Sequence, residues 1–138
     1  MRPAIATLAL CTLAACSPLP DTVGEAAPSD TLWTLESLND GPAAFGATLR
    51  FTSDGRVTGS GPCNRFSARQ TAPLPWFQIE DIAATRRACP DLAAEQVYFT
   101  ALGAMEFAEV AADSLLLTNT DGESLFFRSA ARPEDSKP

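Results

Sequence analysis

Two Asp-Gly turns, each between segments of alternating hydrophobic and polar residues, constrain the fold of this chain more than any other feature. The first lies in residues 47–61, ATLRFTSDGRVTGSG, where Leu49 and Phe51 alternate with polar neighbours and Val57 resumes the alternation. The second lies in residues 115–129, LLLTNTDGESLFFRS. Asp-Gly between two such segments is typical of a tight hairpin turn, because both turn positions favour positive φ. The sequence therefore predicts two antiparallel hairpins.

Three further segments have the length and alternation of strands: residues 31–38, 76–85 and 106–110. Residues 89–105, CPDLAAEQVYFTALGAM, instead suit a helix that starts near Pro90 and Asp91. At 100° per residue, one broad face of this helix is apolar and Val97 breaks the pattern; the face holds Leu92, Ala94, Tyr98, Phe99, Ala101, Leu102 and Met105. We therefore predict a mainly β (α+β) fold, a small, barrel-like antiparallel sheet with one packed helix.

The two ends of the chain do not have the composition of a folded domain. Residues 1–15 carry one charge, Arg2, and an apolar run that would form about 18 Å of helix, too short for a bilayer. This pattern predicts a secretory signal peptide. Residues 16–30 and 130–138 are rich in proline and small or charged residues, so we predict a tether and a disordered tail. The folded domain is expected to span residues 31–129.

Residues 13–16, Leu-Ala-Ala-Cys, resemble the lipobox of bacterial lipoproteins. This resemblance implies cleavage after residue 15, lipidation of Cys16 and attachment to the membrane through the lipid. Ser17 after the cysteine implies sorting to the outer membrane, so the expected location is the cell envelope, on the periplasmic face of that membrane. An ordinary signal peptide with a chance cysteine is the alternative.

The charge of the chain is acidic. Loss of Arg2 with the signal leaves 9 basic against 17 acidic residues, a net charge of −8. Nucleic acid is therefore excluded as an expected partner, because its binding depends on a basic surface. The segment between Cys63 and Cys89 is different, with a local net charge of +2; its charged residues are Arg65, Arg69, Glu80, Asp81, Arg86 and Arg87.

The cysteines of the mature chain predict one disulfide. Cys11 is removed with the signal and Cys16 is expected to be acylated, which leaves Cys63 and Cys89 as a pair in an oxidising compartment. The chain has no histidine, so Ser–His and Cys–His nucleophiles and histidine metal sites are excluded. Two cysteines cannot fill a zinc site, and no nucleotide-binding motif occurs. We therefore expect no catalytic residues, no metal and no cofactor.

A hydrolase would need a pair of carboxylates in a cleft, one of them with a raised pKa. Glu80 and Asp81 are adjacent in a predicted strand, so their side chains are expected on opposite faces. Asp91 and Glu95 are expected to form a solvated helix start. Neither pair favours catalysis.

The order of these segments resembles the META domain, also called the HslJ-like heat-shock domain. The resemblance spans about Leu32 to Phe127. Its most specific parts are Gly61 with residues 63–67, CNRFS, and Thr85-Arg86 with Ala88-Cys89. It implies a small, lipocalin-like, mainly β domain with one helix, of a kind that occurs in bacterial envelope lipoproteins, associated with heat shock and envelope stress and without a general catalytic activity. Pro62 and Ala68 replace glycines that are usual in the family, and Arg87 replaces a commonly apolar residue.

Asn64, Arg65 and Arg86 are the candidate binding residues, because arginine forks suit planar anions. Alternatively, Asn64 caps a turn and the arginines pair with Glu80, Asp81 or Asp91. We expect a monomeric, non-enzymatic, lipid-anchored envelope protein that binds an envelope protein or a small anionic ligand. The alternative is a small secreted inhibitor or ligand carrier, which would require an interior that is not filled by the predicted core; that core includes Trp33, Phe51, Phe99 and Leu102.

Overall fold

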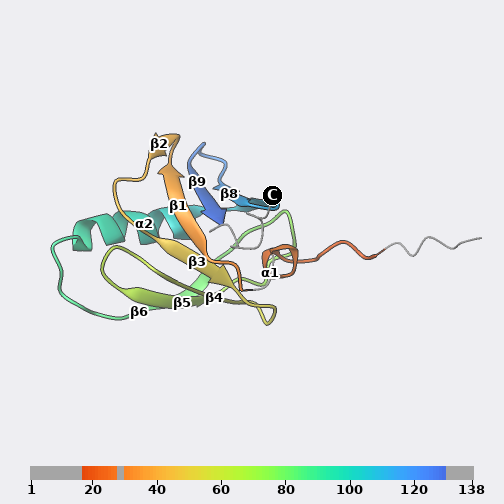
Figure 1. Ribbon diagram of the computed structural model, residues 1–138, viewed down its shortest axis with the longest axis horizontal. Helices are drawn as coiled ribbons and strands as arrows, with labels where there is room; N and C mark the ends of the chain where they lie inside the picture. The colour runs from red at the N-terminus through yellow and green to blue at the C-terminus, as the bar shows by residue number, and fades with distance from the viewer. Residues whose placement is uncertain (1–16, 28–29, 130–138) are drawn as a thin grey trace, which may run out of the picture.

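The computed structural model describes residues 17–27 and 30–129. Its elements are α1 (Val23–Ala26), β1 (Trp33–Leu38), β2 (Gly41–Pro42), β3 (Thr48–Phe51), β4 (Arg56–Ser60), β5 (Arg65–Arg69), β6 (Glu80–Ala84), α2 (Leu92–Ala104), β7 (Phe107–Val110), β8 (Ser114–Thr118) and β9 (Ser124–Ser129). One antiparallel sheet has the strand order β6-β5-β4-β3-β1-β9-β8-β7, and β2 pairs with β1. The sheet curls into a half-barrel, and α2 crosses its open side (Figure 1). The predicted mainly β fold with one packed helix is confirmed.

Both predicted hairpins are present. β3 and β4 pair from Thr48↔Ser60 to Phe51↔Val57 around a turn in which Gly55 has φ 80°. β8 and β9 pair up to Thr118↔Ser124, and Gly122 in that turn has φ 83°. Glycine adopts this left-handed backbone without steric cost, which is why the two Asp-Gly pairs mark these turns.

The loop between β5 and β6 closes one edge of the sheet. Trp76 forms an isolated bridge with Phe107 of β7, and Phe77 N–H donates to the Glu106 carbonyl at 2.7 Å. The strand predicted over residues 76–85 is therefore divided in the structure. Its first residues pair with β7 and only Glu80–Ala84 pair with β5, because the chain crosses from one edge of the half-barrel to the other between them.

The core lies between the sheet and α2. Tyr98, Leu102 and Met105 of the helix are buried, as predicted, and Val97 is exposed, as its break in the pattern indicates. Leu92 was predicted on the apolar face but is 47% exposed, because it is the first residue of α2, at the free end of the helix. The largest fully buried side chains come from the sheet, from α2 and, for Val23, from α1: Trp33, Tyr98, Phe127, Leu49, Leu102, Leu115, Leu117, Leu125, Val23 and Val57.

Part of the predicted tether is folded. Thr22 caps α1 by accepting a hydrogen bond from Glu25 N–H, and Val23 is fully buried. Gly24 packs so closely that a Cβ there would lie 2.7 Å from the Thr52 carbonyl oxygen. The prediction of a flexible segment through residue 30 is wrong for residues 22–27, because Val23 and Ala27 supply a small apolar face that packs on the domain.

The predicted signal peptide, the lipidation site Cys16 and the tail at 130–138 lie outside the described residues. No helix within residues 17–27 and 30–129 is long and apolar enough to cross a membrane.

Candidate functional site

A disulfide between Cys63 and Cys89 joins the turn after β4 to the segment before α2, with 6.0 Å between the Cα atoms. The predicted bridge is confirmed. The connection from β6 to α2, which carries Cys89, lies at the end of the molecule opposite α1 (Figure 1). We call residues 61–65 and 85–91 the bridged loops.

The buried carboxylate of Glu95, on α2, binds the backbone of the first bridged loop from inside the protein. Glu95 is 6% exposed, and its Oε2 accepts hydrogen bonds from Cys63 N–H at 2.9 Å and Asn64 N–H at 2.6 Å. Its Oε1 accepts from Asn64 Nδ2 at 2.6 Å. The expectation of a solvated helix start is therefore wrong for Glu95, although Asp91 is exposed. Glu95 shares a helix face with Tyr98 and Leu102, which turns it toward the sheet.

These hydrogen bonds determine the charge of Glu95. Burial opposes its ionisation, but the donors of Asn64 and Cys63 outweigh burial and hold the pKa of Glu95 below its ordinary value of 4.5. A carboxyl group whose pKa is lowered by folding stabilises the fold above its unfolded-state pKa, and this contribution is lost as the pH falls through the folded-state pKa. Glu95 is therefore ionised, and stabilises the fold, at neutral pH.

Asn64 connects the two bridged loops. It is 4% exposed, and its Oδ1 accepts hydrogen bonds from Arg87 N–H at 2.6 Å and from the Thr85 hydroxyl at 3.0 Å. Because both ends of the amide are engaged inside the protein, Asn64 positions the loops and does not present a binding group at the surface. The prediction that Asn64 contacts a ligand is not supported by this position.

Arg65, Arg86 and Arg87 are exposed on the bridged loops. Thr85 N–H donates a hydrogen bond to the Arg65 carbonyl at 2.9 Å. Arg65 and Arg86 therefore lie at adjacent ends of β5 and β6. Among the described residues, no ion pair involves any of these three arginines; the ion pairs there belong to Arg69 and Arg128. The alternative prediction, that Arg65 and Arg86 form ion pairs with nearby acids, is therefore wrong for the described residues.

The acids of β6 are already paired. Arg69 contacts Glu80 at 3.4 Å and Asp81 at 2.8 Å. The expectation that Glu80 and Asp81 point to opposite faces is wrong, because Asp81 has φ 54° and the pairing of β5 with β6 is irregular at this point. A shallow hollow of about 410 Å³ lies beside this strand pair, lined by Arg65, Phe66, Ser67, Ala83, Ala84 and Thr85.

Residues 26–132 match the sequence profile of the META domain. The chain belongs to the META domain family. Two solved structures share the fold of this META domain. One is an NMR structure of a protein from Burkholderia xenovorans, with TM-score 0.62 and 23% identity, covering 91% of this chain and 100% of that chain. The other is the crystal structure of a DUF4847 family protein from Bacteroides vulgatus, with TM-score 0.62 and 12% identity, covering 80% of this chain and 96% of that chain. No curated protein matches.

Two residues of the site were not singled out from the sequence of this META domain as binding or positioning residues. Thr85 lies in the TRRAC segment that carries the family resemblance, which was the available signal for it. Glu95 lies one and two helical turns before Tyr98 and Leu102 on the buried face, and this spacing was the signal for its burial. Among the described residues, no group of three or more His, Cys, Asp or Glu side chains is arranged to hold a metal ion.

Gly61 has no side chain, and this leaves the space that the Glu95 carboxylate occupies in this META domain. A Cβ at residue 61 would lie 2.8 Å from Glu95 Oε2 and 3.2 Å from Glu95 Cγ. We expect Gly61→Ala to lower the free energy of unfolding by about 1–3 kcal/mol, because the carboxylate must move away from its donors. Chemical denaturation measures this change.

Gly103→Ala is the matched control for Gly61→Ala. Gly103 lies in α2 and a Cβ there would meet nothing within 4 Å. Alanine is the better helix former, so this variant should be more stable by about 0.5–1 kcal/mol. Equal and small effects of the two variants would contradict the placement of Glu95 against Gly61.

Proposed function

We propose that this META domain is a non-enzymatic binding protein of the cell envelope, anchored by lipid at Cys16, that presents the arginines of its bridged loops to an anionic group on a partner. The observation that carries the proposal is that Arg65, Arg86 and Arg87 are exposed and outside the described ion pairs, in a chain whose mature form has a net charge of −8. A guanidinium group forms paired, charge-assisted hydrogen bonds with carboxylates and phosphates.

The rigidity of the bridged loops supports a binding role. The disulfide and the Glu95–Asn64 hydrogen bonds fix the backbone that carries the arginines, so less conformational entropy is lost when a partner binds. Three of the carboxylates near the loops are engaged in contacts within the protein: Glu95 accepts three hydrogen bonds, and Glu80 and Asp81 contact Arg69, while Asp91 is exposed to solvent. These contacts favour a binding role over acid–base catalysis.

We place the proposed protein on the periplasmic face of the outer membrane, with a role in envelope integrity under stress. The lipobox at residues 13–16 and the family resemblance support this location. The carrier alternative has less support, because Trp33, Phe51 and Leu102 are buried in the interior where a ligand would sit. Membrane fractionation and the intact mass of the mature chain test the anchor.

The binding role is tested by the double variant Arg65→Gln with Arg86→Gln. We expect it to lose the envelope component that the lipidated wild type captures by crosslinking and pull-down, while its melting temperature stays unchanged, since neither guanidinium group has an ion-pair partner to lose among the described residues. The control is Arg50→Gln with Arg56→Gln, which removes the same charge from the β3–β4 hairpin and should retain capture. Capture that survives in the first variant would refute the role of the arginines.

A further inference from the structure

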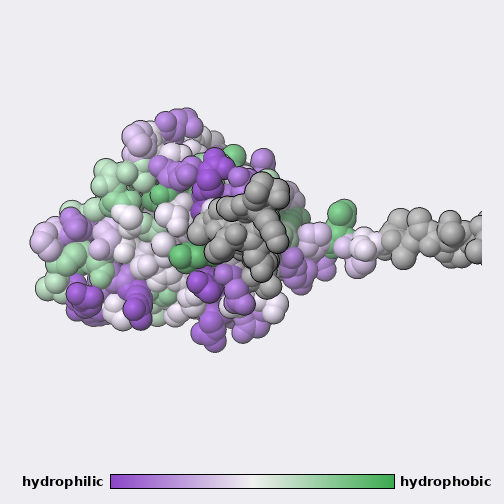
Figure 2. Space-filling view, in the orientation of Figure 1, coloured by the Kyte–Doolittle hydropathy of each residue, from purple (hydrophilic) through white to green (hydrophobic). Residues whose placement is uncertain are grey.

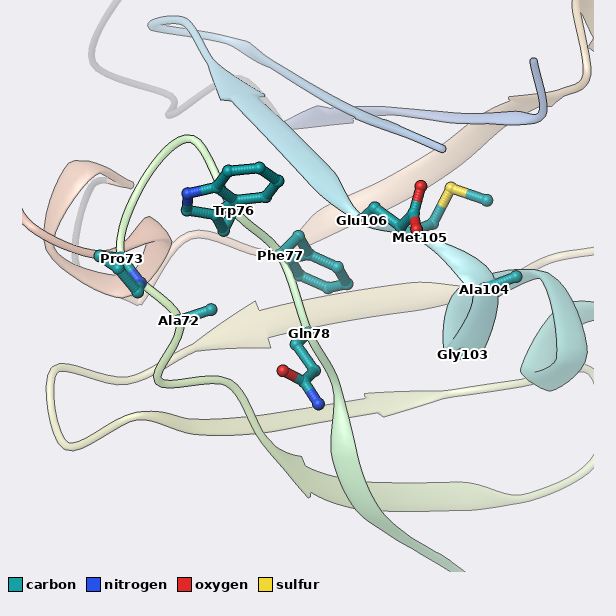
Figure 3. Close-up of a pocket in the computed structure, with 9 residues that line it drawn as sticks. All are labelled: Ala72, Pro73, Trp76, Phe77, Gln78, Gly103, Ala104, Met105 and Glu106. Carbon is teal, nitrogen blue, oxygen red and sulfur yellow. The ribbon is translucent and has the colours of Figure 1, made fainter. Parts of the chain in front are cut away.

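A second surface, at the opposite end of the molecule from the arginines, carries an exposed tryptophan. Trp76 is 55% exposed, and its ring packs on Phe107 with 5.1 Å between the ring centroids. It borders an open cavity of about 680 Å³ whose lining includes Pro73, Phe77, Met105 and Glu106, between the β5–β6 loop and the junction of α2 with β7 (Figure 3). We call Trp76, Phe107 and this cavity the Trp76 face.

The Trp76 face is held in place by backbone hydrogen bonds. Trp76 N–H donates to the Pro73 carbonyl at 2.8 Å, and Ala108 N–H donates to the Pro75 carbonyl at 2.9 Å. The loop is thus fixed to β7, so the backbone that carries the indole ring need not become ordered when the ring makes a contact. Trp76 continues on the surface into the half-buried Phe107 and the exposed Pro73 and Pro75. A contiguous exposed apolar patch indicates a contact surface.

The Trp76 face lies where the chain enters the fold. Leu74 N–H donates to the Asp21 carbonyl at 2.7 Å, and α1, which follows Asp21, contacts β7. Figure 3 shows the ribbon of α1 beside Pro73. Asp21 is five residues after Cys16, so the chain between them reaches at most about 18 Å.

We propose that the Trp76 face is the surface with which the anchored domain lies against the lipid bilayer. This inference rests on the lipidation of Cys16 in the proposed function. A lipid on Cys16 holds Asp21 within about 18 Å of the lipidated residue, and the Trp76 face lies beside Asp21. Tryptophan favours the membrane–water interface, where its apolar ring and polar N–H are both satisfied. Leu19, 88% exposed on the same short connection, adds apolar surface.

The negative charges near the Trp76 face indicate which lipid headgroups it can contact. Asp21, Glu25 and Glu106 are exposed around it, so anionic headgroups would be repelled and zwitterionic lipid is the expected contact. The bridged loops then point away from the bilayer, because they lie at the other end of the molecule (Figure 1). Figure 2 shows hydrophilic residues among apolar ones at that end. The arginines would therefore meet a partner in the periplasm and not the headgroups of their own membrane.

The test uses the full lipidated chain in phosphatidylcholine vesicles whose acyl chains are brominated near the headgroup. The chain has two tryptophans, and Trp33 is fully buried, so it serves as an internal reference. We expect the brominated lipid to quench the Trp76 emission, and the vesicles to lower its quenching by water-soluble acrylamide several-fold. Trp76→Phe should remove both effects and leave the emission of Trp33 unchanged.

A matched control moves the exposed tryptophan to the far end. Leu92→Trp in the Trp76→Phe background places an indole at the exposed first residue of α2. This indole should remain open to acrylamide and unquenched by brominated lipid. Equal quenching at both positions, or Trp76 that stays open to acrylamide on lipidated protein, would overturn the inference.

The intact mass of each preparation separates the two proposals. If the mature chain carries no lipid, the anchor in the proposed function fails. If it carries lipid and Trp76 is not protected, only the orientation fails. Cys16→Ser, which prevents lipidation, should leave Trp76 as accessible to acrylamide with vesicles as without them.

Discussion

Replacing Glu95 with alanine is expected to lower the free energy of unfolding by about 3–5 kcal/mol. The carboxylate accepts hydrogen bonds from Cys63 N–H, Asn64 N–H and Asn64 Nδ2, and its removal takes the acceptor from two donors of buried Asn64 and from the partly buried Cys63 N–H. A domain of this size has a total stability of about 5–15 kcal/mol, so the loss is a large fraction of it. Urea denaturation of the wild type and the variant measures it.

Two controls isolate the carboxylate of Glu95. Glu95→Gln keeps the shape and one acceptor, so it should cost less, about 1–3 kcal/mol. Gln96→Ala changes the exposed neighbour on the same helix and should change stability by less than about 0.5 kcal/mol. If Glu95→Ala and Gln96→Ala had similar small effects, Glu95 would not be the residue that holds the loop.

Loss of the Cys63–Cys89 disulfide is expected to lower the free energy of unfolding by about 3.5 kcal/mol. The bridge closes a loop with a sequence separation of 26, and the estimate follows from the loop entropy that it removes from the unfolded chain. For about 100 ordered residues this corresponds to a fall in melting temperature of about 14–28 °C. Thermal unfolding with and without reductant measures the change.

The double variant Cys63→Ser with Cys89→Ser controls for other effects of the reductant. It should melt near the temperature of the reduced wild type, and reductant should not lower it further. An unchanged melting temperature after complete reduction, checked by thiol titration, would refute the contribution of the bridge. Because Glu95 also holds Cys63 N–H, the effects of bridge loss and Glu95→Ala should not be additive.

The parts of the fold that were predictable from the sequence are those determined locally. Gly55 and Gly122 mark hairpin turns because their positive φ is a property of four consecutive residues. The burial of Tyr98 and Leu102 follows from helical periodicity within one segment. The disulfide was predicted from an even number of cysteines, on the expectation that the chain is exported.

The parts that were not predictable depend on partners far away in the sequence. Val23 is buried because α1 packs close to Thr52, which a segment of proline and small residues does not indicate. Glu95 is buried against hydrogen-bond donors of Asn64, a residue 31 positions earlier in the sequence. A charged residue in the first turn of a helix is usually solvated, so only the three-dimensional contacts reveal its role.

The candidate site was predicted only in part, because some of its contacts also join residues that are far apart in the sequence. Arg65 and Arg86 are exposed on adjacent strand ends, as a surface binding role requires. Asn64, which directly precedes Arg65 in the motif, was a candidate binding residue with a turn cap as the alternative, and it lies buried beneath the surface. Its sequence neighbours gave no indication that its amide would join Arg87, Thr85 and Glu95.

The pH titration of Glu95 by NMR tests most directly whether an ionised, buried carboxylate fixes the bridged loops. The carboxyl carbon of Glu95 is predicted to titrate below 4.5, and the amide protons of Cys63 and Asn64 should shift with the same midpoint, because they donate to that carboxylate. A Glu95 that titrates at or above 4.5, with both amides unaffected, would contradict the account.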